Sequence, residues 1–248
     1  MAYREESYIG NGKLWIKKRG STDPFREVGN CSAISLGIET EETSLLNYRG
    51  GGGEINKRER ISAVSLTVTA HDFSAENLAL ATRGDVSAAA SQAVSAEVQP
   101  GQDSGLIRTT NLIDTAQTVS VTGPAGTPAY AEGTDFSISA AGIEVIDTGS
   151  IASGANIEIT YQSLATDIVD ALMNSGDEYE AVADLINEAQ SSRYVVDIWR
   201  AKAAPADELA LIGDDYGAQT LPFSLLLDTT KEAAGDSGYF KVTKQVLS

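Results

Sequence analysis

The sequence predicts a mainly β protein with one flanking α-helix and a small all-β insertion. Two observations predict this fold class. Apolar residues alternate with small or polar residues in many short segments, as expected for strands with one buried face. Groups of Gly, Pro, Asn and Asp separate these segments, as turns do. Only residues 74–84 have both a helix N-cap signal at one end and a helix stop signal at the other.

The N-terminal part contains three predicted strands, of which the third has the clearest pattern. Its inward face alternates with an outward face of Ala, Ser and Thr, which is small and hydroxylic rather than charged. The three strands cover residues 12–18, 34–39 and 58–73. The predicted inward residues of the third strand are Val64, Leu66, Val68 and Ala70.

A short helix is expected to follow the third strand, over residues 74–84. Ser74 can accept a hydrogen bond from the first free backbone N–H groups, and Glu76 favours the positive end of the helix dipole. Gly84 is the predicted C-terminal stop, because glycine adopts the left-handed conformation at low cost.

The residue composition changes after the predicted helix. A low-complexity Ser/Ala stretch precedes short apolar strands separated by turn signals such as PGQDSG and TGPAGTP. We therefore predict two parts: a core domain, residues 1–90 and 165–248, and a β-rich insertion subdomain, residues 91–164.

Residues 177–190 are ambiguous between helix and strand. Their apolar residues have helical spacing, and Ser175 with Glu178 resembles a capping box, so local propensity favours a helix. Three further strands are predicted after this segment, over residues 193–201, 219–228 and 237–244, and residues 205–217 are predicted to form a compact connection between the first two.

The net charge of −17 is unevenly distributed. Residues 1–110 hold 12 basic and 14 acidic side chains, whereas residues 111–248 hold 6 and 21. Such a surface cannot neutralise phosphates, so binding to nucleic acid or to an anionic membrane is not expected. The sequence contains no apolar run near 18 residues and does not begin like a secretory signal, so we expect synthesis as a soluble protein.

Catalytic, metal and cofactor chemistry find little support in the sequence. Cys31 and His71 are the single cysteine and the single histidine, and we expect a structural role for both. The four glycines before Glu54 do not match a phosphate loop, because a carboxylate would repel the anion where a lysine is required. We therefore predict no enzyme activity, no cofactor and no metal.

Residues 45–62, LLNYRGGGGEINKRERIS, suggest a docking arm instead. Ordering four glycines is costly, and the apolar residues on both sides would be unnecessary in a solvated linker. The predicted contact residues are Leu45, Leu46, Tyr48, Arg49, Gly50, Gly51, Gly52, Gly53 and Ile55.

The order of three segments resembles the major tail tube protein of long-tailed, siphovirus-type bacteriophages. These segments are REVGNCSAISLGIETEE, RERISAVSLTVTAHDFSAENLALATRG and RYVVDIWRAKAAPADELALIGDDYGAQTLPFSLLLD. The resemblance covers residues 10–84 and 177–245, with the β-rich insertion outside it.

The resemblance implies a β-sandwich or barrel subunit that assembles into hexameric rings, which stack into the hollow tube that delivers phage DNA. The implied partners are copies of the chain itself, the tape measure protein, the tail terminator and the tail tip proteins. The implied location is the virion, after assembly in the host bacterial cytoplasm. Residues 40–58 resemble the loop that reaches a neighbouring subunit, and the family places a strand at 177–190, which we prefer to the helix.

An acidic bore would let DNA pass without holding it, because each like-charge repulsion is weak and screened by salt. By strand parity alone, the candidates to face the bore are Glu39, Glu41, Glu180, Asp184 and Glu188. Two other functions remain open at this stage: a ring or tube protein similar to those of type VI secretion, and a carbohydrate-binding β module.

Overall fold

The structure is a computed structural model that describes residues 7–246, and it is mainly β. The chain forms two compact units. Unit 1 contains the residues up to 86 and from 169 onward, and unit 2 contains residues 87–168. The insertion predicted from the sequence, residues 91–164, lies within unit 2.

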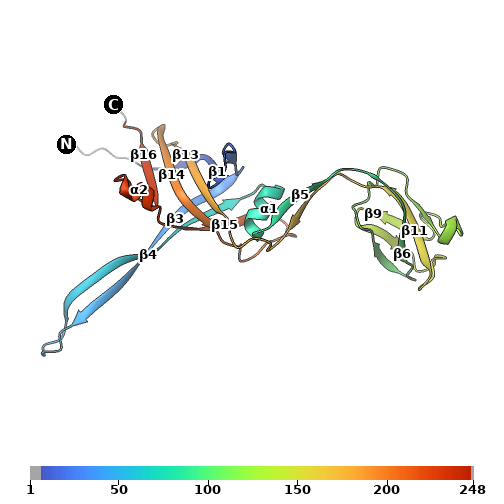
Figure 1. Ribbon diagram of the computed structural model, residues 1–248, viewed down its shortest axis with the longest axis horizontal. Helices are drawn as coiled ribbons and strands as arrows, with labels where there is room; N and C mark the ends of the chain where they lie inside the picture. The colour runs from blue at the N-terminus through green and yellow to red at the C-terminus, as the bar shows by residue number, and fades with distance from the viewer. Residues whose placement is uncertain (1–6, 247–248) are drawn as a thin grey trace. The chain divides into compact units, whose positions relative to one another are not determined.

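Unit 1 is built on an eight-stranded antiparallel sheet with the order β2-β1-β13-β14-β15-β4-β3 (Figure 1). One edge of β14 pairs with two strands: its N-terminal part pairs with β16 and its C-terminal end pairs with β15. The sheet therefore branches at β14. The strands are β1 (Gly10–Lys18), β2 (Arg26–Glu27), β3 (Cys31–Leu46), β4 (Glu54–Ala70), β13 (Glu178–Asn187), β14 (Ser192–Ala203), β15 (Gln219–Leu225) and β16 (Phe240–Lys244). The helices are α1 (Ala75–Thr82) and α2 (Thr229–Ala233).

The ambiguous segment is a strand, β13, as the resemblance implied and against local helix propensity. It pairs with β1 on one side and with β14 on the other, so every turn of a helix here would break two strand ladders. Its buried residues Ala181 and Ala183 alternate with Glu180, Val182 and Asp184, which is the period of a strand with one buried face.

The core of unit 1 lies against the inward face of β4, where the predicted alternation is confirmed. The four predicted inward residues of that strand are at most 5% exposed. Leu14 of β1, Ile198 of β14, and Leu221 and Phe223 of β15 pack in the same cluster. Burial of these apolar side chains is the main force that holds the sheet together.

The predicted helix is confirmed as α1, with a different C-terminal residue. Ser74 is the N-cap, and its hydroxyl oxygen accepts a hydrogen bond from the Asn77 N–H at 3.2 Å. The residue in the left-handed conformation is Arg83, with φ 51°, and not Gly84. The guanidinium of Arg83 donates two hydrogen bonds to the Ala203 carbonyl oxygen, which offsets the cost of that conformation.

Unit 2 contains two three-stranded sheets, β6-β11-β8 and β7-β10-β9, and side chains from both form one core. Phe136, Ile143 and Ile157 are among the residues fully buried there. A two-stranded ribbon of β5 and β12 contains both boundaries between the units. The elements are β5 (Asp85–Ala89), β6 (Ala93–Pro100), β7 (Gly105–Arg108), β8 (Ser120–Thr122), the short 3₁₀ turn η1 (Pro124–Gly126), β9 (Phe136–Ser139), β10 (Gly142–Val145), β11 (Asn156–Gln162) and β12 (Thr166–Asp170).

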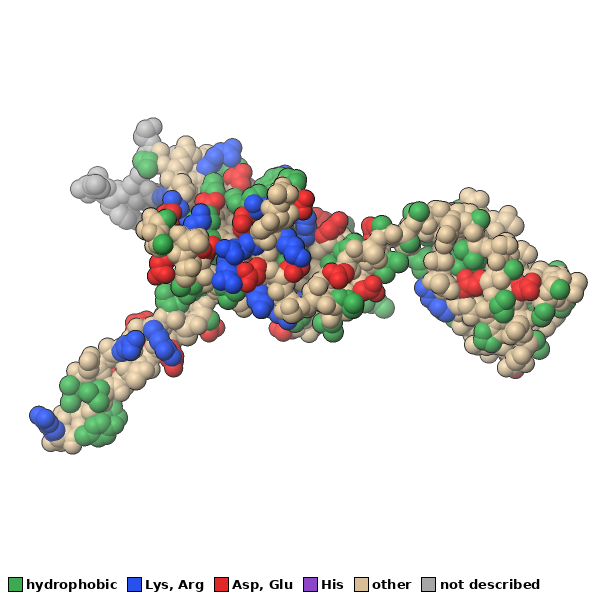
Figure 2. All heavy atoms as spheres, in the orientation of Figure 1, with side chains coloured by type: hydrophobic (Ala, Val, Ile, Leu, Met, Phe, Trp, Pro, Cys, Tyr) green, Lys and Arg blue, Asp and Glu red, His purple; other side chains and the backbone are tan. Residues whose placement is uncertain are grey.

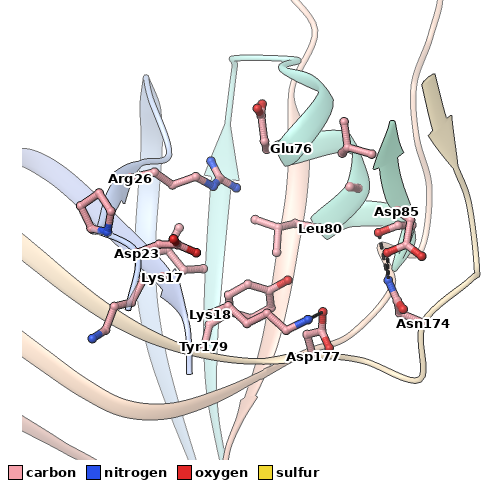
Figure 3. A pocket seen from close by; sticks show the side chains of 15 residues that line it. Lys17, Lys18, Asp23, Arg26, Glu76, Leu80, Asp85, Asn174, Asp177 and Tyr179 are labelled. Atoms are coloured by element: carbon pink, nitrogen blue, oxygen red, sulfur yellow. Dashed lines mark hydrogen bonds and ion pairs between the residues drawn. The ribbon is translucent and has the colours of Figure 1, made fainter. Parts of the chain in front are cut away.

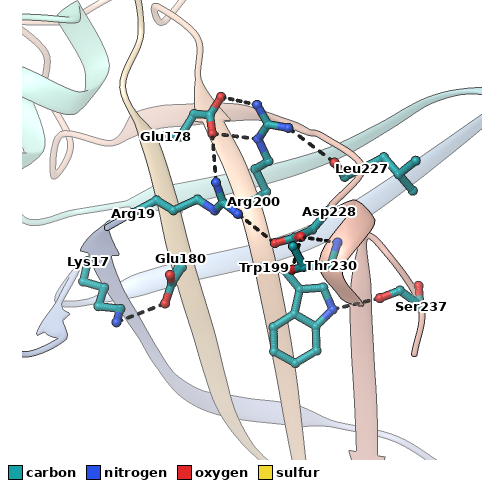
Figure 4. Close-up of polar contacts among 10 residues, drawn as sticks. All are labelled: Lys17, Arg19, Glu178, Glu180, Trp199, Arg200, Leu227, Asp228, Thr230 and Ser237. Carbon is teal, nitrogen blue, oxygen red and sulfur yellow. Dashed lines mark hydrogen bonds and ion pairs between the residues drawn. The ribbon is translucent and has the colours of Figure 1, made fainter. Parts of the chain in front are cut away.

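A polar network ties the start of α2 to β13, to β14 and to the turn after β1 (Figure 4). Arg200 forms a bidentate pair with Glu178, with both nitrogen–oxygen distances at 2.7 Å, which lowers the pKa of Glu178. Asp228 caps α2 by accepting hydrogen bonds from the Thr230 hydroxyl and backbone N–H, and it also pairs with Arg19 at 2.9 Å. These contacts, led by the Thr230 hydroxyl, lower the pKa of Asp228 to about 2.

We expect the stability of unit 1 to fall as the pH drops from about 3.8, the ordinary pKa of aspartate, toward about 2, the pKa of Asp228 in the folded chain. A depressed folded pKa stabilises the protein above the unfolded pKa, and this contribution is lost on protonation in the fold. The variant Asp228→Asn keeps an oxygen for the cap and cannot titrate, so its stability should change less over this window. Urea midpoints measured at a series of pH values check this, and parallel curves for the two proteins would contradict it.

Candidate functional site

A long two-stranded arm extends from the unit 1 sheet (Figure 1). Beyond a bulge between Glu39 and Thr40, β3 and β4 stay paired with each other from the cross-strand pair Thr40 and Ile61 as far as the turn. In this part β4 has no other partner among the described strands, because β15 pairs with β4 only over residues 65–70. We define the arm as residues 40–61. The predicted long loop at 40–58 is therefore wrong in form, because cross-strand pairing reduces the unpaired turn to residues 47–53. Ion pairs of Glu41 with Arg60 and of Glu42 with Lys57 support that pairing.

The four glycines close the arm in a conformation that other residues avoid. Gly50 to Gly53 have φ values of 100°, 93°, 70° and 88°, all in the left-handed region. Asn47 holds the turn, because its amide donates to the Gly50 carbonyl oxygen at 2.7 Å and its backbone N–H donates to that of Gly53 at 2.9 Å. The turn is thus closed by bonds within the chain, which offset the cost of ordering the glycines.

The tip of the arm, residues 45–55, exposes apolar side chains that nothing in the described chain covers. Tyr48 is 82% exposed, and Leu45, Leu46 and Ile55 are each about half exposed or more. Arg49, the single charged residue between positions 43 and 53, has no ion-pair partner within residues 7–246. Figure 2 shows hydrophobic side chains gathered near the end of the arm with a basic side chain at its extremity. Solvent-exposed apolar groups at this density are typical of a contact surface.

Two of the acidic candidates for the bore lie together on β13. Glu180 and Asp184 occupy the face of the sheet away from the core. The same face carries basic side chains. Lys17 pairs with Glu180 at 3.0 Å, and Lys13 is the cross-strand neighbour of Asp184. Arg193 lies 4.0 Å from Asp184. The face is therefore of mixed charge, which could not be predicted without the pairing of β1 with β13.

The other three candidates do not join this pair. Glu39 lies on the outward face of β3 opposite Ala63, and Glu41 lies in the arm, paired with Arg60. Glu188 follows the end of β13 in a turn, where it accepts a hydrogen bond from the Asn11 amide at 2.9 Å. In the sheet order, β14, β15 and β4 separate β13 from β3, so one copy of the chain does not bring the five carboxylates together.

Sequence reasoning missed an exposed segment between β14 and β15, which we call the acidic loop, residues 207–216. It was predicted as a compact connection, but all residues from 210 to 216 are exposed. Leu211 is 76%, Ile212 98% and Tyr216 97% exposed. The signal was present as three large apolar residues set among Asp and Glu without a strand or helix period, a pattern that local burial rules do not explain.

A cavity of about 520 Å³ lies beside α1, where the end of β1 meets the start of β13 (Figure 3). Lys18 and Asp177 form an ion pair at 2.7 Å on its wall, and this hydrogen bond raises the pKa of Lys18. Burial lowers the pKa of Arg26 and raises the pKa of Tyr179 in the same wall. The lining contains no Ser, Thr, Cys or His, the usual nucleophiles and bases of acyl-transfer sites.

The single cysteine and histidine have structural surroundings. Cys31 is half buried against the unit 1 core, and burial, with smaller effects of Asp72 and Glu27, raises the pKa of its thiol. A raised pKa leaves less of the reactive thiolate. His71 Nδ1 donates to the Gly217 carbonyl oxygen at 3.0 Å and so joins the end of β4 to the start of β15.

Over residues 7–246, no group of three or more His, Cys, Asp and Glu side chains is placed to hold a metal ion. Within the same residues, no helix has the length and apolar character needed to cross a membrane.

Comparison with known proteins places the chain in a family without assigning an activity. No curated protein matches the sequence. A family model matches residues 7–243, which cover both units. The chain therefore belongs to the family described as "Protein of unknown function UCP028589".

Proposed function

We propose that this chain is the tail tube subunit of a long-tailed bacteriophage, which assembles into hexameric rings that stack into a hollow, DNA-conducting tube. The observation that carries the proposal is the arm. It extends the sheet by paired strands and exposes four large apolar side chains and a charged group at its tip. Nothing within residues 7–246 covers these groups. Such an element gains stability when it contacts another molecule, and a second copy is always present at assembly.

Two open sheet edges support ring formation. In the order of the unit 1 sheet, β2 and β3 stand at the two ends, and each has a neighbour on one side only. Unpaired N–H and C=O groups along such an edge are templates for another strand. Contacts between the two different edges of neighbouring copies are head-to-tail contacts, which give closed rings when the rotation between copies is right.

The outward face of β13 suits the lining of a bore. Glu180 and Asp184 are partly neutralised by Lys17 and Arg193, and the whole chain has a net charge of −17. A face with balanced charges inside an acidic protein neither condenses on phosphates nor repels them strongly. The proposal includes the tape measure, terminator and tail tip proteins as partners and the virion as the location.

Negative-stain electron microscopy of the purified full-length protein tests the proposal. We expect hollow polymers of uniform diameter made of stacked rings. Isolated hexamers that never stack would instead favour a ring protein similar to those of type VI secretion. A monomer at every concentration in light scattering would contradict the proposal, and retention of that monomer on a carbohydrate resin would favour a sugar-binding module.

A further inference from the structure

The acidic loop, residues 207–216, has the composition of a receptor for a basic, apolar ligand. It carries Asp207, Glu208, Asp214 and Asp215, and the sequence has no basic residue between Lys202 and Lys231. Within residues 7–246, none of these four carboxylates has an ion pair or a side-chain hydrogen bond. The loop thus presents a concentrated negative charge that the described part of the chain leaves uncompensated.

The same loop exposes its apolar side chains almost completely. Ile212 and Tyr216 are nearly as accessible as they would be in an unfolded chain, and Leu211 is three-quarters exposed. The loop is nevertheless anchored, because His71 binds the Gly217 carbonyl oxygen and an added Cβ at Gly217 would lie 2.9 Å from the Phe73 ring. An anchored loop that holds apolar groups in water is a contact surface without its partner.

The tip of the arm is complementary to this loop. Both surfaces present a nearly fully exposed tyrosine and exposed aliphatic residues, so each can bury the apolar groups of the other. Arg49 gives the tip a positive charge that has no ion-pair partner among the described residues, whereas Lys57 and Arg60 farther down the arm are paired. Opposite charges at the rim of an apolar contact set its register and favour this pairing over others.

The two surfaces cannot meet within one chain. The tip includes the first two residues of β4, and the acidic loop ends near the last residue of that strand, where Gln219 pairs with Ala70. The 17 residues of β4 span about 50 Å at the rise of an extended strand. A contact between two different surfaces at opposite ends of one strand is a head-to-tail contact, which links copies into a closed ring or an open stack according to the rotation between them.

We propose that the tip of the arm of one copy docks on the acidic loop of a second copy, with Arg49 facing Asp214 and Asp215 and with Tyr48 packed among Leu211, Ile212 and Tyr216. This inference rests on the proposed function for the kind of polymer formed. The docking contact itself requires only that copies of the chain associate.

A charge exchange tests the contact. Arg49→Glu alone, and the double change Asp214→Lys with Asp215→Lys alone, should each raise the concentration needed for assembly by about tenfold or more, because each places like charges in contact. The chain with all three changes should assemble at a concentration close to that of wild type. A matched control, Glu132→Lys with Asp147→Lys in unit 2, makes the same charge change at exposed sites and should leave assembly unchanged. Absence of rescue in the triple variant would overturn the inference.

Cross-linking separates this inference from the proposed function. On a Cys31→Ala background, copies with Tyr48→Cys and differently tagged copies with Ile212→Cys are mixed and oxidised, and we expect a disulfide that joins the two tags. Copies with Val98→Cys in place of Ile212→Cys are the control and should not cross-link. Tag-joining disulfides in a polymer without a bore would support the docking contact and contradict the proposed function. Hollow tubes that form without these disulfides would support the function and overturn the contact.

Discussion

Shortening the arm is expected to abolish assembly while unit 1 still folds. Residues 42–59 can be replaced by Asn-Gly, because Glu41 and Arg60 are direct cross-strand partners and a two-residue turn of this type joins such a pair. The removed residues contain no buried side chain, so the free energy of unfolding should stay within about 1 kcal/mol of wild type. The removed tip carries the apolar groups that we assign to the contact. Electron microscopy and light scattering should show monomers where wild type forms polymers.

The control for this prediction keeps the length and the apolar residues of the arm. Exchange of one ion pair, Glu42→Lys with Lys57→Glu, preserves the opposite charges across the strands. This variant should assemble like wild type. Tubes of normal diameter from the shortened chain would show that the arm does not hold copies together.

The largest loss of stability is expected from Phe223→Ala. Phe223 is 3% exposed in β15, and its ring makes an edge contact with Tyr179 at a centroid distance of 6.3 Å. Removal of a buried phenyl ring costs the transfer free energy of the lost atoms and leaves a cavity, together about 4 kcal/mol. Trp15 and Trp199, the two tryptophans of the chain, both lie in unit 1, so urea unfolding followed by tryptophan fluorescence reports on this unit.

Unit 2 provides the matched control for that measurement. Phe136 is 1% exposed in the separate core of unit 2. Phe136→Ala should therefore leave the transition seen by tryptophan fluorescence nearly unchanged while it destabilises unit 2. A loss below about 1 kcal/mol for Phe223→Ala would mean that the unit 1 core does not depend on this ring as its burial indicates.

Local sequence patterns predicted the features that depend on burial alone. The alternation around Val68 identified β4 and its inward face, and the strands of unit 2 at 120–122, 136–139, 142–145 and 156–162 lie in the region where short strands between turns were predicted. Ser74 predicted the start of α1, because an N-cap residue forms its hydrogen bond with a backbone N–H only three residues away. These features need no knowledge of distant parts of the chain.

The segment at 178–187 shows where local patterns fail. Its apolar residues fit a helical spacing, yet β1 and β14 supply backbone partners on both sides, and Leu14 stands opposite Ala183 although the two are far apart in the sequence. The resemblance to a tail tube subunit favoured the strand for this segment, and propensity did not. Pairing with distant strands outweighed a weak local preference.

The candidate site also has features that the sequence predicted and features that it did not. By itself, the sequence determined the position of the arm and its exposed anchors Leu45, Tyr48 and Ile55. Apolar residues beside four glycines are unnecessary in a solvated linker, so their presence indicates a contact surface. Only the tertiary structure decided that the arm is a paired hairpin, that Lys17 offsets Glu180, and that the acidic loop lies at the far end of β4. The physical reason is that burial leaves a period in the sequence, whereas the register between distant strands and the charges that it brings together leave none.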